Sequence, residues 1–483
     1  MKSENLEDLS TVDGRSQMHA TGLRELVGHM SVLQYRELPS HTVQVLKLCT
    51  LDTIGCLVGG IDTAVAGKLF NMIENGPVRF SGASSIPSSS HTVSPEMAAL
   101  VNGTVAHALI FDDMHRTAKI HPGVFTVPAV MALNECIGAD GKTLLTAIAA
   151  GYETASRIGM AINMSEHRHK GWRATSTVGS LGAAAAASRL LGLSALQSHH
   201  ASAAATAQAS GTFAFAEGGG MELYLAGGTA ARNGIVAALL GGAGFHGALD
   251  PLEAKDGGLF TASSADCDPS QLTSGLGTEF KLGEVCIKMR PTCHSTQTAI
   301  DAALALRSEY GVRIADIERI IVDAGEITRL QCGWDFYPAS AEQMVFHMGF
   351  ILASVFETGN ITSADLQGPL LDDPEYVRIA RNTRVNSVAE LTAIYKVKKP
   401  SIVHLYMKDG RVLTHRVDYC KGDPENFPTN DEVIAKFRQL ASSALDPKAQ
   451  DQVIDMILNI ESQASLSALP KLLKGARRAS RPK

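Results

Sequence analysis

One short segment of the chain concentrates more acid and base chemistry than any other. Residues 101–122 begin with an apolar run of small residues and then supply two aspartates, three histidines and two cations, which are His107, Asp112, Asp113, His115, Arg116, Lys119 and His121. Titratable groups gathered after an apolar helix are how a pocket acquires general acids and bases. The plainer interpretation of the aspartate pair is a solvated helix cap.

The elements that must position these residues are predicted to be helices packed on helices. Apolar residues recur at three- and four-residue spacings in residues 41–60 and 143–162, which is the period of a helix with a buried face. The run 182–193 has almost no bulky side chain before Leu190, so neighbouring helices can approach it closely. Gly192 predicts where this helix ends.

The pattern changes near residue 280. Residues 319–324 are β-branched and strand-like, and residues 401–407 and 411–419 flank Lys408-Asp409-Gly410, a hairpin signal. Helical patterns return over residues 432–445 and 452–460. We therefore predict a mainly α fold, in which a large discontinuous all-helical domain carries an inserted, smaller α+β lid domain. The predicted segments are a disordered N-terminus over 1–20, the helical domain over 21–278 plus 426–483, and the lid over 279–425.

Composition indicates a compact enzyme with no nucleic-acid or membrane partner. The 483 residues are 45% hydrophobic and 19% charged, and the net charge of −6 gives no basic surface for nucleic acid or an anionic membrane. The chain opens without a secretory pattern, and no apolar run reaches ~18 residues without polar interruption. Eight cysteines without a CxxC pair predict reduced, largely buried thiols and an intracellular, cytoplasmic location.

No cofactor motif is present, and we expect neither a cofactor nor a metal. The glycine-rich pieces at 218–220, 227–228 and 241–244 follow no predicted strand, so we interpret them as helix ends and close contacts rather than phosphate loops. The histidines at 167, 169, 199 and 200 lie among polar residues without matching cysteines or carboxylates. They are predicted to be surface histidines.

Six motifs carry a resemblance to a known family. In chain order they are residues 51–56, 101–122, 171–179 and 230–234, then Ile287-Lys288 with Pro291 and Cys293, and finally residues 300–303. In order and spacing, across nearly the whole chain, they resemble the MmgE/PrpD family of 2-methylcitrate dehydratases, cis-aconitate decarboxylases and iminodisuccinate epimerases. The resemblance implies a helical domain with a lid, a cleft between them, a small-molecule substrate and a homodimer.

Three departures from the family pattern bear on the chemistry. Ile110 occupies the position, two residues before the first aspartate, where aconitate-processing relatives carry another acid. Arg173 replaces a histidine in the element that reads Gly171-Trp172-Arg173-Ala174-Thr175, and Leu223 stands where relatives present a lysine. Carboxylates in a partly dry cleft need cationic partners. These losses therefore predict an apolar cleft with few cations, lined by Ile110, Met114, Leu223 and Phe336.

A reduced set of chemical groups remains. The predicted catalytic residues are His121, Lys288, Asp113 and Tyr337, and the predicted substrate-binding residues are Ile110, Asp112, Met114, Arg173, Leu223 and Arg290. His121 matches the family's His-Pro position and Lys288 its Ile/Phe-Lys position; a capping imidazole and a surface lysine are the plainer alternatives. Arg173, Lys288 and Arg290 could still hold one carboxylate.

Two functions follow from this set. The first is a cofactor-independent enzyme on the MmgE/PrpD scaffold that cyclises or rearranges a larger, more apolar molecule in secondary-metabolite biosynthesis, for example by a [4+2] cycloaddition. Such a closure depends on holding one conformer and needs no base. The alternative is a lyase of the family's usual kind, which decarboxylates a cis-aconitate-like acid or dehydrates an alkylcitrate. In that case His121 donates a proton and Arg173 substitutes for the missing histidine.

Overall fold

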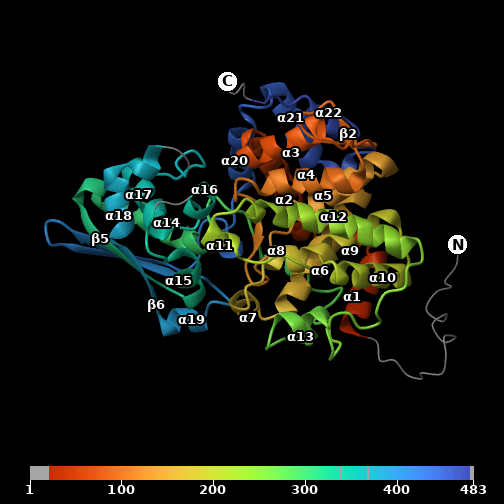
Figure 1. Cartoon of the computed structure of the whole chain (residues 1–483), viewed down its shortest axis with the longest axis horizontal. Helices are drawn as coiled ribbons and strands as arrows, with labels where there is room; N and C mark the ends of the chain where they lie inside the picture. Colours follow the sequence, from red (N-terminus) through yellow and green to blue (C-terminus); the bar gives the residue numbers. More distant parts are fainter. Residues whose placement is uncertain (1–20, 338–339, 367–368, 479–483) are drawn as a thin grey trace.

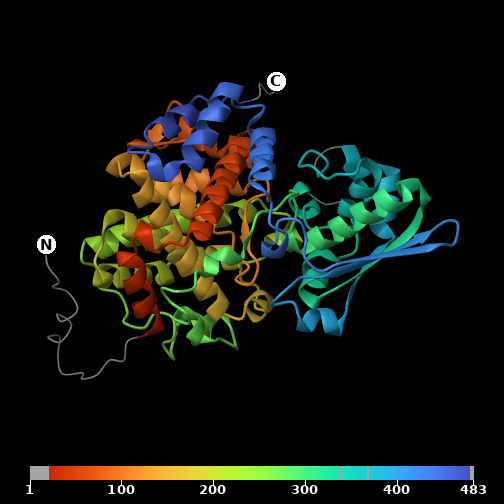
Figure 2. The ribbon, with the colours of Figure 1, turned by 180° about the vertical axis from the view of Figure 1, so that it is seen from behind.

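The fold was analysed in a computed structural model, which describes residues 21–337, 340–366 and 369–478. The predicted disordered N-terminus, residues 1–20, lies outside the described residues. Helices dominate and the strands are few and short, so the predicted mainly α class is confirmed. Figures 1 and 2 show a large helical body beside a smaller part that contains the long strands.

The helical body is built from segments at both ends of the described chain. Its helices are α1 (Gly22–Val32), α2 (Ser40–Gly59), α3 (Ala64–Asn75), α4 (Pro95–His107), α5 (Gly123–Ile137), α6 (Gly141–Ala161), α7 (Met164–His169), α8 (Ala174–Thr177), α9 (Gly179–Leu191), α10 (Ala195–Ala207), α11 (Phe215–Gly218), α12 (Glu222–Gly242), α13 (Leu259–Ser263), α20 (Asn430–Ala441), α21 (Pro447–Leu458) and α22 (Ala468–Lys474). Its short strands are β1 (Ser84–Ser85), β2 (Thr92–Val93), β3 (Met114–His115) and β4 (Val285–Cys286). The C-terminal helices return to this body, where α20 packs on α2 (Figure 1).

The smaller part is a mixed sheet with helices. Its helices are α14 (His294–Tyr310), α15 (Glu326–Cys332), α16 (Ala341–Met344), α17 (Met348–Thr358), α18 (Pro374–Arg381) and α19 (Ala389–Ala393). Its strands are β5 (Ile317–Ala324), β6 (Thr383–Ser387), β7 (Ser401–Met407) and β8 (Val412–Val417), in the order β6-β5-β7-β8. β5 pairs with β6 in parallel, the other pairs are antiparallel, and α14 packs on β7 and β8.

Two apolar cores follow this division of the chain. One runs from Leu23 to Ile287 and resumes from Val433 to Ala476, and the other consists mainly of residues between Ala299 and Leu413. The second core also receives side chains from the helical body, among them Leu223. The lid boundaries at residues 279 and 425 stay a prediction.

Most predicted elements lie where the sequence placed them. Residues 41–60 form α2, residues 143–162 form α6, and Gly192 ends α9 in the left-handed conformation with φ 67°. The glycine pair at 227–228 lies inside α12, where a Cβ on Gly228 would come within 2.2 Å of Oγ1 of Thr104 in α4. The interpretation of these glycines as close helix contacts therefore holds, because α4 carries the residues that lead into the segment 108–122.

Two helices are long and apolar enough to cross a membrane by length and composition alone. They span Ser40–Asp62 and Glu222–Gly242, and 89% and 67% of their most apolar windows are buried inside the fold. Burial of this extent is what core helices of a packed bundle show.

Candidate active site

A pocket lies between the helical body and the sheet-containing part. From the body it is lined by residues that include Ile110, Met114, Lys119, His121, Arg168 and Arg173, and from the other part by Cys293, His294, Ser295, Gln331, Tyr395 and Lys399. The space inside it, including the portion open to solvent, is about 690 Å³. Its position between two parts of the chain and its size are those of a small-molecule site.

The lining of this pocket is cationic. Among the described residues that line it, Lys119, Arg168, Arg173 and Lys399 carry basic side chains, and none is an aspartate or a glutamate. Nζ of Lys399 and the Nε atoms of Arg168 and Arg173 are buried without a hydrogen-bond partner in the part of the chain that the structure describes. Because a buried charge without a partner is costly, this lining is built for an anion. The predicted cleft with few cations is therefore wrong.

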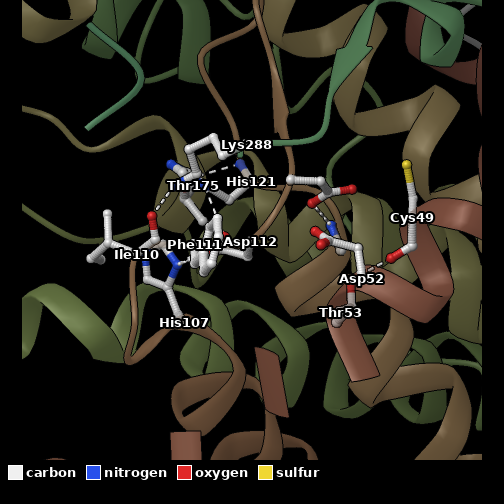
Figure 3. Close-up of polar contacts among 12 residues, drawn as sticks. Cys49, Asp52, Thr53, His107, Ile110, Phe111, Asp112, His121, Thr175 and Lys288 are labelled. Carbon is white, nitrogen blue, oxygen red and sulfur yellow. Dashed lines mark hydrogen bonds and ion pairs between the residues drawn. The ribbon is translucent and has the colours of Figure 1, made fainter. Parts of the chain in front are cut away.

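A buried carboxylate joins two histidines behind this pocket. Nδ1 of His107 lies 3.0 Å from both carboxylate oxygens of Asp112, and Nδ1 of His121 lies 2.8 Å from Oδ2 (Figure 3). The His121 contact has the distance of an ion pair without the alignment of a full hydrogen bond. Asp112 is fully buried between the two histidines and does not line the pocket, so its position does not support the predicted role in substrate binding.

Arg173 fixes the protonation of His107. Its Nη2 lies 2.7 Å from Nε2 of His107. A guanidinium can only donate, so Nε2 accepts this hydrogen bond and the ring proton resides on Nδ1, directed at Asp112. Burial lowers the pKa of His107 and the Asp112 carboxylate raises it, and the pKa is lowered overall. Both observations describe a neutral His107 that orients Arg173.

His121 enters the pocket as a neutral imidazole. Burial lowers its pKa to about 3, although the Asp112 carboxylate opposes this shift. Burial also raises the pKa of Asp112, but His107, His121 and Lys288 outweigh it and hold that pKa well below its usual range. The ionised carboxylate favours the tautomer of His121 with its proton on Nδ1, which leaves Nε2 with a free lone pair.

A second buried network supports the backbone at the pocket wall. Nζ of Lys288 donates a hydrogen bond to the carbonyl oxygen of Ile110, and Nζ of Lys436 donates to those of Phe111 (2.7 Å) and Lys288 (2.8 Å). Lys436 also pairs with the carboxylate of Asp52, which Figure 3 labels, at 2.5 Å. Lys288 is 1% exposed. It is therefore no surface lysine, yet it lies behind the pocket wall and holds the backbone there.

Backbone strain accompanies this wall. Ile110 has φ 51° and Lys119 has φ 52°, a left-handed conformation that is unusual for a β-branched side chain. The strained positions bracket the segment that carries Asp112, and both residues line the pocket. Strain of this kind persists only where the surrounding structure fixes it, and it concentrates at functional sites.

Asp113 has a different environment from Asp112. Its Oδ2 accepts a hydrogen bond of 2.6 Å from the hydroxyl of Tyr152, and its Oδ1 one of 2.9 Å from the amide of Gly123. Burial raises its pKa to about 7, although these hydrogen bonds lower it. Asp113 does not line the pocket. The predicted catalytic role is therefore not supported by its position, and the aspartate pair is no solvated cap, because both members are fully buried.

Several predicted site residues lie outside the pocket. Leu223 is fully buried in the apolar core shared with the lid, and Phe336 packs against the ring of His347 at 5.3 Å. Tyr337 is 45% exposed and lies in a neighbouring surface pocket, where its hydroxyl accepts a hydrogen bond from Gln343. Arg290 donates to the carbonyl of Met289 and does not reach the pocket. Four other predicted site residues, Ile110, Met114, His121 and Arg173, do line the pocket.

Other residues of the pocket were not predicted from the sequence. Lys399 lies far from every motif, and nothing in its sequence neighbourhood pointed to a site, whereas Arg168 lies three residues before the Gly171–Thr175 element. His167 was predicted to lie on the surface, but it is 1% exposed and lines the pocket; His199 and His200 are buried as well. The signal for His167 was its proximity to the Gly171–Thr175 element.

The group formed by His107, Asp112 and His121 has the composition of a metal site. One ligand atom from each lies within 4.8 Å of the others. Arg173, however, donates to Nε2 of His107, and Lys288 adds positive charge beside Asp112. These two fixed cations already neutralise the carboxylate and would repel a metal ion.

Comparison with known proteins follows the same division of the chain. The family model described as MmgE/PrpD N-terminal domain matches residues 24–271, and the model described as MmgE/PrpD C-terminal domain matches residues 291–462. The cis-aconitate decarboxylase-like protein oryM of Aspergillus oryzae is 28% identical over 473 residues, which are 93% of this chain and 97% of that protein. The cis-aconitate decarboxylases of Aspergillus terreus (26%; 93% of this chain and 95% of that protein) and Homo sapiens (28%; 95% and 94%) are similar over the same extent. The chain belongs to the MmgE/PrpD family.

Proposed function

We propose that this protein is a lyase that removes carbon dioxide from a small polycarboxylate of the cis-aconitate type. One observation carries the proposal, namely the four basic side chains without acidic partners that surround the pocket beside His121. The family membership and the relatives named cis-aconitate decarboxylases support the reaction class. Dehydration of an alkylcitrate is the second candidate.

The cations lie in two groups that can bind two carboxylates. Arg173 lies next to the histidine pair. The ammonium groups of Lys119 and Lys399 lie 4.9 Å and 5.7 Å from the ring centre of Tyr395. Ile110 and Met114 offer apolar contacts for the carbon chain that joins the two acids. A small polycarboxylate is thereby held at both ends, which fixes the conformer that reacts.

The decarboxylation needs little more than this placement and one proton. As the bond from carbon to the departing carboxylate breaks, its electron pair moves into the conjugated carbon chain toward a carboxylate held by the cations. A proton must then reach carbon. A bound carboxylate raises the proton affinity of the neighbouring His121 imidazole, so this residue takes up a proton with the substrate and delivers it from Nε2.

Dehydration would use the same residue in the opposite direction. The free lone pair on Nε2 of neutral His121 would remove a proton next to a carboxylate, and hydroxide would leave as water after protonation. Burial keeps His121 neutral in the unliganded protein, which is the protonation state in which Nε2 can accept that proton. This observation keeps dehydration as the second candidate.

The pericyclic alternative does not fit this pocket. A large apolar substrate would cover Lys119, Arg168, Arg173 and Lys399 without pairing them, and each buried cation left unpaired costs several kcal/mol. The apolar replacement at Leu223, which motivated that alternative, does not line the pocket. The cationic lining therefore favours the lyase.

The test is direct. Purified protein is incubated with cis-aconitate and, separately, with methylcitrate, while carbon dioxide release and ultraviolet absorbance are followed. We expect carbon dioxide from cis-aconitate, and we expect Lys399→Met to raise KM about tenfold or more, since a charge-assisted contact is worth about 1.5–3 kcal/mol. Lys408→Met, in the exposed β7–β8 turn, is the control. The proposal would be refuted if the protein neither converted nor saturably bound either acid.

A further inference from the structure

Four side chains of the metal-binding type meet where the chain crosses between the helical body and the lid. Cys286 ends β4 and His294 begins α14 on the outgoing crossover. Cys420 and Asp423 follow β8 on the return crossover, just before the short helix η7 (Pro424–Asn426). The two crossovers thus contribute two residues each.

The four ligand atoms are close and buried. Oδ1 of Asp423 lies 3.1 Å from Nε2 of His294 and 3.2 Å from Sγ of Cys286, and Sγ of Cys420 lies 3.9 Å from Nε2 of His294. Cys286, Cys420 and Asp423 are each 1% exposed and His294 is 5% exposed, and neither cysteine is in a disulfide. In a tetrahedral zinc site the ligand atoms are separated by roughly 3.3–3.8 Å, given bond lengths of ~2.0–2.3 Å. The two contacts of Asp423 lie just below this range, and the ligand atoms of Cys286, His294 and Asp423 all lie within 4.8 Å of one another. Sγ of Cys420 stands outside this group of three, with its contact to His294 at the upper edge of the range.

The donor set selects the kind of ion. Two sulfurs, one imidazole nitrogen and one carboxylate oxygen are soft to borderline ligands in a set of four. Mg²⁺ and Ca²⁺ require six or more oxygens, so this set excludes them and favours zinc.

The surrounding charge fits an occupied site. Two thiolates, one carboxylate and a divalent ion together carry a net charge of −1. Lys399 and Arg116 both act on Cys286 as nearby positive charges. Arg116 is already paired with Glu425 at 2.6 Å, whereas Nζ of Lys399 is buried without a partner among the described residues. Lys399 would thus gain a counter-charge from the occupied site.

We propose that Cys286, His294, Cys420 and Asp423 bind one zinc ion that ties the two crossovers together. Binding replaces the thiol protons of the two cysteines, so two protons pass to solvent for each ion, and nothing is oxidised or reduced. His294 also lines the substrate pocket. A bound ion would therefore fix this wall of the pocket together with the crossover, independently of which reaction the pocket catalyses.

The test uses Co²⁺ as a spectroscopic probe for zinc. After dialysis against a chelator, the protein is titrated with Co²⁺ and then with Zn²⁺. We expect one Co²⁺ per chain, a thiolate-to-cobalt absorption band, two protons released in weak buffer, and loss of the band when Zn²⁺ displaces the probe. Zn²⁺ should also raise the Tm, because it binds only the folded chain. Metal at the group His107, Asp112 and His121 would give no thiolate band.

Matched variants locate the site. Cys286→Ser and Cys420→Ser should each remove or strongly weaken the thiolate band, while Cys56→Ser, a fully buried cysteine of α2, should leave it unchanged. Should either variant fail to fold, the wild-type titration still decides. The proposal would be overturned by absence of stoichiometric binding, by binding without the thiolate band, or by a band of wild-type intensity in either the Cys286→Ser or the Cys420→Ser variant.

Discussion

The guanidinium of Arg173 lies 2.7 Å from Nε2 of His107, so a permanently charged donor occupies the one ring nitrogen of His107 that Asp112 does not. The sequence resemblance indicates that Arg173 replaces a histidine of the family element. The substitution does not empty the site, because it adds a cation to the pocket and connects that cation to the Asp112–His121 pair. The pocket therefore remains polar with Arg173 at this position.

Arg173→Met should weaken substrate binding more than it slows chemistry. The variant removes one carboxylate contact and leaves Nε2 of His107 without its donor, so we expect KM to rise about tenfold to a hundredfold, as for loss of a charge-assisted hydrogen bond. Steady-state kinetics with cis-aconitate measure this. Arg319→Met, on the exposed side of β5, should leave KM unchanged, and a fall in kcat alone would contradict the assignment.

His121→Ala should abolish proton transfer without unfolding the chain. We expect kcat to fall ~10² to 10⁴-fold with little change in KM, the range for removal of a general acid or base. Single-turnover and steady-state kinetics test this. The exposed His169→Ala is the control. A loss below about tenfold would show that placement by the cations, and not His121, supplies the catalysis.

Leu223→Lys should not create or enhance carbon dioxide release from cis-aconitate. Leu223 is fully buried in the core shared with the lid. The ammonium group of the introduced lysine would therefore enter an apolar environment without a partner, at a cost of several kcal/mol. We expect a large fall in Tm. Leu225→Lys on the same helix, where the side chain is 38% exposed, should leave the Tm nearly unchanged. A stable Leu223→Lys protein with faster turnover would show that the family's lysine position still faces the pocket.

Sequence patterns predicted the scaffold better than the site, for a physical reason. α2, α6, α9 and the β7–β8 hairpin are encoded locally, by apolar spacing and by Gly192 and Gly410. The charge of the pocket depends instead on side chains from distant segments. Lys399 and Arg168 line the same pocket as His121 only because of the tertiary fold. A prediction made from the motif positions alone therefore expected an apolar cleft. Leu223 shows the converse, because a motif position can lie in a core.

Buried histidines should make the fold sensitive to acid. Burial lowers the pKa of four histidines to between about 3 and about 4, namely His115, His121, His167 and His347. In the unfolded chain each of these histidines takes up a proton near pH ~6.5, whereas in the folded chain it stays neutral. The stability that each contributes is therefore fully present above pH ~6.5 and is lost as the pH falls from there toward the folded pKa. At pH 5 the loss is about 2 kcal/mol for each.

Asp113 opposes this effect and must be counted with it. Its folded pKa is raised to about 7 by burial, so its contribution is fully present below pH ~3.9 and is lost as the pH rises through about 7. From pH 7 to pH 5 this single group offsets about one histidine. The net expectation is a fall in the free energy of unfolding of several kcal/mol over this range, measured by urea denaturation.

His115 offers the sharpest check of that acid sensitivity. Its Nε2 donates to the carbonyl of Lys281 at 2.9 Å, and its Nδ1 accepts from the amide of Ala118 at 3.1 Å. The bond from Ala118 needs the neutral ring, because a protonated Nδ1 could no longer accept. His115→Gln cannot titrate, so between pH 5 and pH 6 its unfolding should take up about one proton fewer than wild type, whatever its absolute stability. His169→Gln, which changes an exposed ring, should leave the slope as in wild type. An unchanged slope for His115→Gln would show that His115 is protonated in the folded chain and that Ala118 has lost its acceptor.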